Sequence, residues 1–234
     1  MSDTLRVGMV AEGFTDPIII QAAVESMLGE RRFVLVPIQP ESSLAFETPG
    51  SAGQLGGGWK GVYKWCCQTV VRAGGHLRND VILDLYDILI FHLDADVASE
   101  NPDEYLPELS YQLPCDLPCP PASDTVNALR AVLLSWLGET EVPARTVLCI
   151  PSKSTEAWVV TALFPDDSTM RRLGPECLPD PAARLSQQKL DVRISKSQDD
   201  YRAKSESIRQ NWPVVTSVLP EAFRFQAEFL AALT

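Results

Sequence analysis

The sequence predicts an α/β fold in which a mainly parallel sheet of four strands lies between helices, with a helical C-terminal extension. The strands are expected in four short runs rich in Val, Ile and Leu, at residues 6–11, 33–38, 88–93 and 146–150. Strands that are buried on both faces of a parallel sheet have such continuous apolar sequences. The segments between the runs are long enough for helices, and alternating strands and helices favour a parallel sheet.

The first half of the chain contains two predicted helices and a glycine-rich segment. Pro17 suits the first turn of a helix, and Asp16 is its expected N-cap. Residues 48–61 include six glycines and few apolar residues, which predicts a mobile loop. The helices of this half are expected at residues 17–28 and 62–73.

The second half begins with an irregular insertion and ends with helices. Residues 97–123 contain six prolines, so they are expected to form a long irregular segment beside the carboxyl ends of the strands. Asp124 is an expected N-cap, and Ser154 or Thr155 is expected to cap the helix that carries Glu156. The helices are expected at residues 124–137, from Thr155 to near Pro165, at 186–211, and at 214–230 with a break at Pro220.

The 234 residues suit one domain, or a core at residues 1–165 with the helical extension, residues 166–234, packed on the same domain. No apolar stretch approaches the roughly 20 residues that span a bilayer, and the N-terminus lacks the features of a secretory signal. We therefore expect a cytoplasmic protein with no membrane partner.

The six cysteines of the chain are expected to be reduced thiols. Cys115 and Cys119 have no nearby His, so a zinc site there is disfavoured.

Acidic residues follow three of the predicted strands. Glu12 and Asp16 follow the first, Asp94 and Asp96 the third, and Glu156 lies six residues beyond the fourth. Loops from the carboxyl ends of parallel strands converge, and carboxylates gathered there would repel one another unless cations neutralised them. Two Mg²⁺ or Mn²⁺ ions prefer such oxygens and can promote phosphodiester cleavage.

Further residues beside these acids have a possible role at the site. Lys153 would add a positive charge that stabilises the transition state. His92 is either a proton shuttle or, the interpretation we favour, a packed strand residue. The glycine-rich run at residues 56–61 could cover the site or cradle phosphate, although it lacks the P-loop order, and Trp59 and Tyr63 could stack on a base.

The acidic segments resemble the Toprim domain of topoisomerases, bacterial primases, small ribosomal-RNA maturases and the overcoming-lysogenization-defect nucleases. The resemblance consists of Glu-Gly-x-x-Asp at residues 12–16, Asp-x-Asp at 94–96, and a later acid, Glu156. Residues 151–158 are most similar to the nuclease members, in which a Lys and an acid open the following helix. The resemblance covers about residues 5–164. It implies that Glu12, Asp94, Asp96 and Lys153 are catalytic, and that Glu12, Asp16, Asp94, Asp96 and Glu156 bind metal.

Each acid also has a structural interpretation. The charge of Glu12 could simply interact favourably with the positive N-terminal end of the helix that begins near Pro17, and Asp16 could be only the N-cap of that helix. Glu156 could be only an acidic residue in the first turn of its own helix. Asp94 and Asp96 could be turn formers. We favour metal binding because two charges directly after a buried strand are costly without a cation.

The overall charge of −11 opposes nucleic-acid binding. Residues 171–209, however, contain 9 basic and 6 acidic residues. This segment could contact a nucleic-acid backbone or be a solvated surface.

The predicted function is a metal-dependent nuclease of DNA or RNA. Because the chain is acidic and lacks a P-loop, we expect it to act in a larger, oligomeric assembly whose partner supplies ATP hydrolysis or nucleic-acid affinity. The resemblance to nuclease members that are found in phage-defence systems implies such a role, with an ATPase as the partner. The alternatives are a metal-dependent phosphatase or nucleotidyltransferase acting on nucleotides, and a catalytically silent structural subunit.

Overall fold

The protein has a four-stranded sheet whose strands are all parallel, in the order β2-β1-β3-β4. The computed structural model describes residues 4–41, 55–102, 106–110, 112–166, 174–188, 193–195 and 197–234. Both ends of every strand lie within one residue of the predicted positions, so the predicted α/β class with a parallel sheet is confirmed. The strands are β1 (Leu5–Val10), β2 (Phe33–Gln39), β3 (Ile88–His92) and β4 (Thr146–Cys149).

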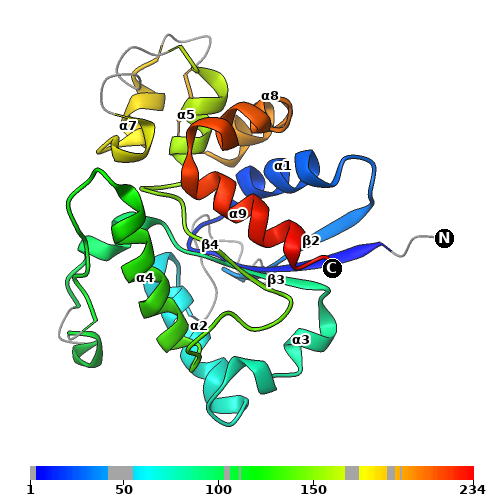
Figure 1. Cartoon of the computed structure of the whole chain (residues 1–234), viewed down its shortest axis with the longest axis vertical. Helices are drawn as coiled ribbons and strands as arrows, with labels where there is room; N and C mark the ends of the chain where they lie inside the picture. Colours follow the sequence, from blue (N-terminus) through cyan, green and yellow to red (C-terminus); the bar gives the residue numbers. More distant parts are fainter. Residues whose placement is uncertain are drawn as a thin grey trace.

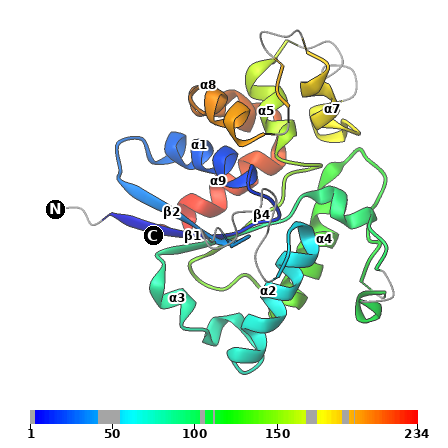
Figure 2. The ribbon, with the colours of Figure 1, turned by 180° about the vertical axis from the view of Figure 1, so that it is seen from behind.

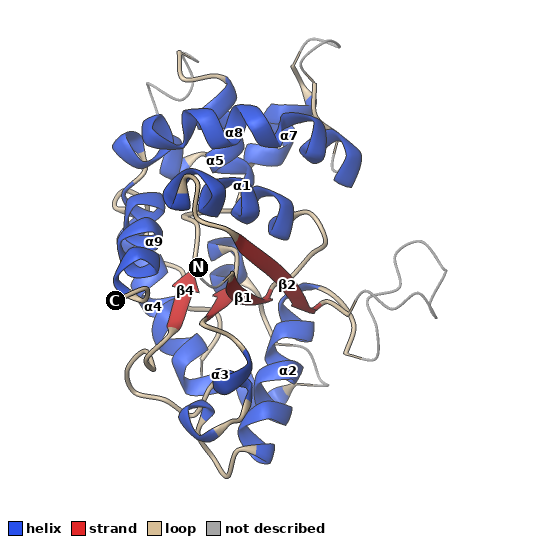
Figure 3. Ribbon diagram, turned by 90° about the vertical axis from the view of Figure 1, so that its right-hand side faces the viewer, coloured by secondary structure: helices blue, strands red, loops and turns tan. Residues whose placement is uncertain are grey.

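Helices cover both faces of the sheet (Figure 1 and Figure 3). One face carries α1 (Asp16–Leu28), α5 (Glu156–Leu163), α8 (Gln198–Val218) and α9 (Pro220–Ala231), with α7 (Pro181–Ser186) beside α5. The other face carries α2 (Gly58–Arg72), α3 (Ile82–Leu85) and α4 (Ala122–Trp136). Short 3-10 helices are η1 (Leu77–Asn79), η2 (Ala95–Ser99), η3 (Pro107–Leu109) and η4 (Pro175–Cys177). Within the described residues, we find no helix with the length and apolar character needed to cross a membrane.

Strand β3, one of the two inner strands, is buried along its whole length. Its side chains belong to two hydrophobic clusters, one on each face of the sheet. Ile88 and Ile90 pack on the side of α1, α5 and α8, whereas Leu89 and Phe91 pack on the side of α2 and α4. Successive side chains of a strand point to opposite faces. His92 therefore continues the row of Ile88 and Ile90 and points toward α1 and α5.

The C-terminal helices share a core with the sheet. Trp158 of α5 contacts Trp212 of α8 edge-on, with ring centroids 5.1 Å apart, and stacks on Phe225 of α9 at 5.6 Å. Figure 2 shows α8 lying across α1 and α5, seen from behind. The extension therefore covers the same side of the sheet toward which His92 points.

The glycine-rich segment differs from its prediction as a mobile loop. Helix α2 begins at Gly58, four residues before the predicted start, and the Gly58 N–H donates to the Glu12 carbonyl at 2.9 Å. A Cβ on Gly61 would clash with the Gly56 carbonyl oxygen and would lie 2.8 Å from Gln39 Nε2, so this glycine permits a close approach of the Gly56 backbone and of Gln39 in β2. The end of the segment is therefore packed helix, whereas residues 48–54 lie outside the described part of the chain.

Three further predicted helix boundaries are wrong. Helix α4 begins at Ala122, with Pro121 as its N-cap in place of Asp124. The helix predicted at residues 186–211 begins later, at Gln198, because the Ser197 side chain accepts the Asp200 N–H and caps α8 there. Helix α8 also continues through Pro213 to Val218. The predicted break at Pro220 is confirmed, and this proline opens α9.

The expectation that all cysteines are reduced is wrong for one pair. Cys119, in the proline-rich segment, is disulfide-bonded to Cys177 in η4, with Cα atoms 5.7 Å apart. The two are 58 residues apart, so only the folded chain brings them together. The bond removes Cys119 as a zinc ligand beside Cys115, which is a free thiol together with Cys66, Cys67 and Cys149.

Candidate functional site

Three loops meet at the carboxyl ends of β1, β3 and β4. Beyond β3 and β4 the backbones still pair, because the N–H groups of Ala95 and Asp96 donate to the carbonyls of Pro151 and Lys153, each at 3.1 Å. From the β1 loop, a carboxylate oxygen of Glu12 accepts the Asp94 N–H at 2.7 Å. The predicted convergence of these loops is therefore present.

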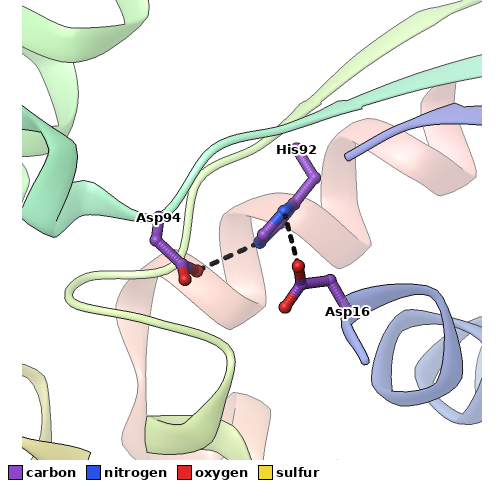
Figure 4. Close-up of side chains that lie close together, drawn as sticks. All are labelled: Asp16, His92 and Asp94. Carbon is purple, nitrogen blue, oxygen red and sulfur yellow. Dashed lines mark ion pairs between the residues drawn. The ribbon is translucent and has the colours of Figure 1, made fainter. Parts of the chain in front are cut away.

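Asp16, His92 and Asp94 form a buried group (Figure 4). His92 Nε2 lies 3.1 Å from Asp94 Oδ1, and His92 Nδ1 lies 3.8 Å from Asp16 Oδ2. One potential ligand atom from each residue lies within 4.8 Å of the others. The exposed fractions are 0% for His92, 5% for Asp16 and 9% for Asp94. This group could hold a metal ion.

Thr155 fixes both carboxylates of the group. Its N–H donates to Asp94 Oδ1 at 3.1 Å, and its hydroxyl donates to Asp16 Oδ1 at 3.0 Å. Thr155 occupies the N-cap position of α5 as predicted, but its side chain makes no capping hydrogen bond. Asp16 likewise lies in the first turn of α1, where Thr15 is the N-cap, and its Oδ2 accepts the Gly13 N–H. The expected capping roles of Thr155 and Asp16 are therefore wrong. The Thr155 hydroxyl donates to Asp16, and the Asp16 carboxylate belongs to the buried group.

Burial and mutual repulsion shift the protonation equilibria of this group. Burial raises the pKa of Asp94 to about 7, even though His92 favours its charged form. Burial and the charge of Asp94 also raise the pKa of Glu12. For His92, burial opposes protonation, but Asp16 and Asp94 outweigh it and raise the pKa to about 9. In the absence of a metal ion, His92 therefore carries a proton at neutral pH and offsets part of the cost of the carboxylate charges. An ion bound to a ring nitrogen would replace that proton.

The other predicted site residues lie around this group at different depths. Glu12 is half-buried, and its carboxylate is held at the end of β3 by the Asp94 N–H. Glu156 is 1% exposed in the first turn of α5, and its charge contributes to the raised pKa of Asp94. The Asp96 side chain is exposed and lies outside the three-residue group. Lys153 is half-buried in the loop that runs beside Asp96.

Tyr201 was not foreseen by the sequence analysis. It projects from α8 in the C-terminal extension, is 1% exposed, and donates from its hydroxyl to Glu156 Oε1 at 2.9 Å. A tyrosine 45 residues from its partner, in a helix of mixed polarity, gives no local signal of this contact. The extension therefore contributes directly to the surroundings of the site.

We expect Tyr201→Phe to lower the free energy of unfolding by about 1.5–3 kcal/mol, the range for a hydrogen bond to a charged group. The variant keeps the buried ring but removes the donor to Glu156. Urea denaturation of both proteins measures the difference. Tyr63→Phe is the matched control, because the Tyr63 hydroxyl donates to Glu108 at an exposed position and should cost less than about 1 kcal/mol. Equal stability of wild type and Tyr201→Phe would contradict this role.

The structure also places the aromatic and basic residues that were considered for nucleic-acid contact. Trp59 is 7% exposed and packs on Trp136, which argues against base stacking by Trp59. In α8, Arg202 and Arg209 pair with acidic residues one turn earlier on the same helix. Nine basic residues lie between residues 171 and 209. The described part of the chain includes five of them, Arg184, Arg193, Arg202, Lys204 and Arg209. The other four, Arg171, Arg172, Lys189 and Lys196, lie outside it.

Comparisons of the chain with protein-family models, with curated proteins and with solved structures found no match.

Proposed function

We propose that this protein is a divalent-metal-dependent nuclease with a Toprim-like centre that hydrolyses phosphodiester bonds of DNA or RNA. The observation that carries the proposal is the buried Asp16–His92–Asp94 group at the carboxyl ends of the strands. Two carboxylates removed from water are costly unless they are paired or bind a cation. Carboxylate oxygens are also the ligands that Mg²⁺ and Mn²⁺ prefer. The donor set therefore fits the proposed ion.

In the proposed site, Asp16 and Asp94 hold a divalent ion, and Glu12 and Glu156 lie beside them as further acidic ligands. Asp96, at the exposed rim, would hold a second ion. Bound Mg²⁺ or Mn²⁺ would supply an activated water and neutralise charge on the leaving oxygen. Thr155 keeps the carboxylates of Asp16 and Asp94 in place through its two hydrogen bonds. Lys153 would supply positive charge to the phosphoryl group in the transition state.

The charge of the chain supports a role as one subunit of a larger assembly. A net charge of −11 opposes binding to a polyanion. We therefore propose that a partner, such as an ATPase subunit, supplies nucleic-acid affinity, as in a phage-defence assembly. The part of the basic stretch that the structure describes, including Arg184 and Lys204, is the surface that we propose for direct contact with the nucleic-acid backbone.

We expect millimolar Mn²⁺ or Mg²⁺ to raise the melting temperature of the protein by about 5 °C or more over its value in EDTA. An ion that binds only the folded state at 100 times its dissociation constant contributes about 2.7 kcal/mol of stability, and a protein of this size gains about 2–4 °C for each kcal/mol. Differential scanning fluorimetry measures the shift, with KCl at the same ionic strength as the control. Identical melting temperatures in all buffers would count against a metal site.

The nuclease activity itself is tested by incubating single- and double-stranded DNA and RNA with the protein and Mg²⁺ or Mn²⁺. We expect cleavage that EDTA abolishes. A preparation of Asp94→Asn, purified in the same way, controls for contaminating nucleases. Turnover of nucleotides or phosphomonoesters without cleavage of any polymer would replace this proposal with a phosphatase or nucleotidyltransferase.

A further inference from the structure

His92 is fully buried, although it lies at the end of a strand where three loops converge. Neither of its ring nitrogens makes a hydrogen bond of regular geometry within the described part of the chain. Buried polar side chains nearly always have such partners, so an exception needs an explanation. Both nitrogens instead face carboxylates, with Asp94 on one side of the ring and Asp16 on the other (Figure 4).

We infer that His92 Nε2 is itself a metal ligand beside Asp94 Oδ1, and that the site consequently prefers a first-row transition ion to Mg²⁺. The inference rests on the proposed metal-dependent function and specifies which ion that function uses. It changes the site from a set of carboxylates alone to a mixed set that contains an imidazole.

The distance between the two atoms fits neighbouring ligands of one ion. Ligands at right angles on an ion with bonds of about 2.1 Å lie about 3.0 Å apart. Asp94 Oδ1 and His92 Nε2 are 3.1 Å apart. Asp94 Oδ1 is already oriented by the Thr155 N–H, so one partner of the pair is held in place before an ion binds.

The second ring nitrogen has the surroundings of a ligating histidine. A histidine that binds metal through one nitrogen usually presents the other N–H to a carboxylate or carbonyl, which fixes the tautomer and the ring orientation. Asp16, which is proposed above as a ligand of the same ion, faces Nδ1 through Oδ2 at 3.8 Å. This is longer than a hydrogen bond, so the contact places a carboxylate near Nδ1 without bonding to it. Asp16 is in turn held by the Gly13 N–H and the Thr155 hydroxyl.

The chemistry of imidazole then determines the preference among ions. Mg²⁺ favours oxygen ligands, whereas imidazole nitrogen suits transition ions, whose affinities at such sites rise from Mn²⁺ toward Cu²⁺. We expect Mn²⁺ to bind at least about tenfold more tightly than Mg²⁺. His92→Gln supplies an amide in place of imidazole, and it should reduce that ratio while retaining a polar side chain.

The test is pulsed electron paramagnetic resonance of the Mn²⁺-loaded full chain, which detects a nitrogen bound directly to the ion. The chain contains two histidines, and the other, His76, is exposed and outside the acidic group. His76→Gln is therefore the matched control. We expect ¹⁴N coupling in wild type and in His76→Gln, replaced by ¹⁵N coupling when histidine is ¹⁵N-labelled, and lost in His92→Gln. Titrations with Mn²⁺ and Mg²⁺ on the same proteins give the affinity ratios.

The possible results separate this inference from the function on which it rests. Bound Mn²⁺ without nitrogen coupling would overturn the role of His92 and leave a carboxylate metal site. No Mn²⁺ binding to the folded wild type would overturn both. If His92→Gln does not fold, the spectra of ¹⁵N-labelled wild type and His76→Gln still decide the assignment.

Discussion

Replacing Asp94 by asparagine is expected to lower Mn²⁺ affinity by more than about 100-fold and to abolish cleavage. Changing an outer partner of a metal site already costs about 10–100-fold, and we propose that Asp94 is a direct ligand. The asparagine oxygen can still accept the Thr155 N–H that Asp94 accepts in the wild type. Calorimetric titration with Mn²⁺ and a cleavage assay on the same preparation measure both losses.

The same variant should be at least as stable as the wild type in EDTA, because a buried charge in a repulsive group has been removed. Glu100→Gln is the matched control, since Glu100 is exposed in the same segment and should tolerate neutralisation without effect. Wild-type affinity and full activity in Asp94→Asn would remove Asp94 from the mechanism.

Lys153→Ala is expected to slow turnover by about 10²–10³ while leaving metal affinity nearly unchanged. This is the usual cost of deleting one preorganised donor to the transition state. The alanine keeps the backbone carbonyl that accepts the Asp96 N–H, so the paired loops should remain in place. Single-turnover rates at saturating Mn²⁺, together with metal titrations, measure the two effects separately.

Two further variants define what the charge of Lys153 does. Lys153→Arg should restore the rate only in part, because a planar guanidinium does not replace a compact ammonium. Lys64→Ala, at an exposed position of α2, controls for the loss of one positive charge elsewhere. If Lys153→Ala cleaves at the wild-type rate, Lys153 is a surface residue at the entrance to a helix and no more.

The strands were predictable because their signal is local. Each strand is a run of apolar residues buried on both faces, and β3, for example, is recognisable from Ile88 to Phe91 without knowledge of its neighbours. The order of acidic residues after the strands also predicted that Glu12, Asp16 and Asp94 would lie close together. That prediction needs only the rule that the ends of parallel strands share one edge of the sheet.

The contacts that could not be predicted join residues far apart in the chain. Thr155 has the sequence context of an N-cap, yet its hydroxyl reaches Asp16, 139 residues away. Tyr201 reaches Glu156 only because α8 folds back over α5. The glycine-rich start of α2 was read as a loop because helix propensity penalises glycine. The absence of a side chain at Gly61 instead allows the Gly56 carbonyl and the Gln39 side chain to approach the helix closely.

The central claim is that the strand-end acids bind a divalent ion, and a crystal of the wild-type protein soaked in Mn²⁺ tests it most directly. An anomalous difference map locates manganese without assumptions about its ligands. We predict a peak in contact with Asp94 Oδ1 and close to Asp16 and His92. A well-ordered map with no peak at the carboxyl ends of β1 and β3, at a Mn²⁺ concentration that produces peaks elsewhere on the protein, would contradict the account.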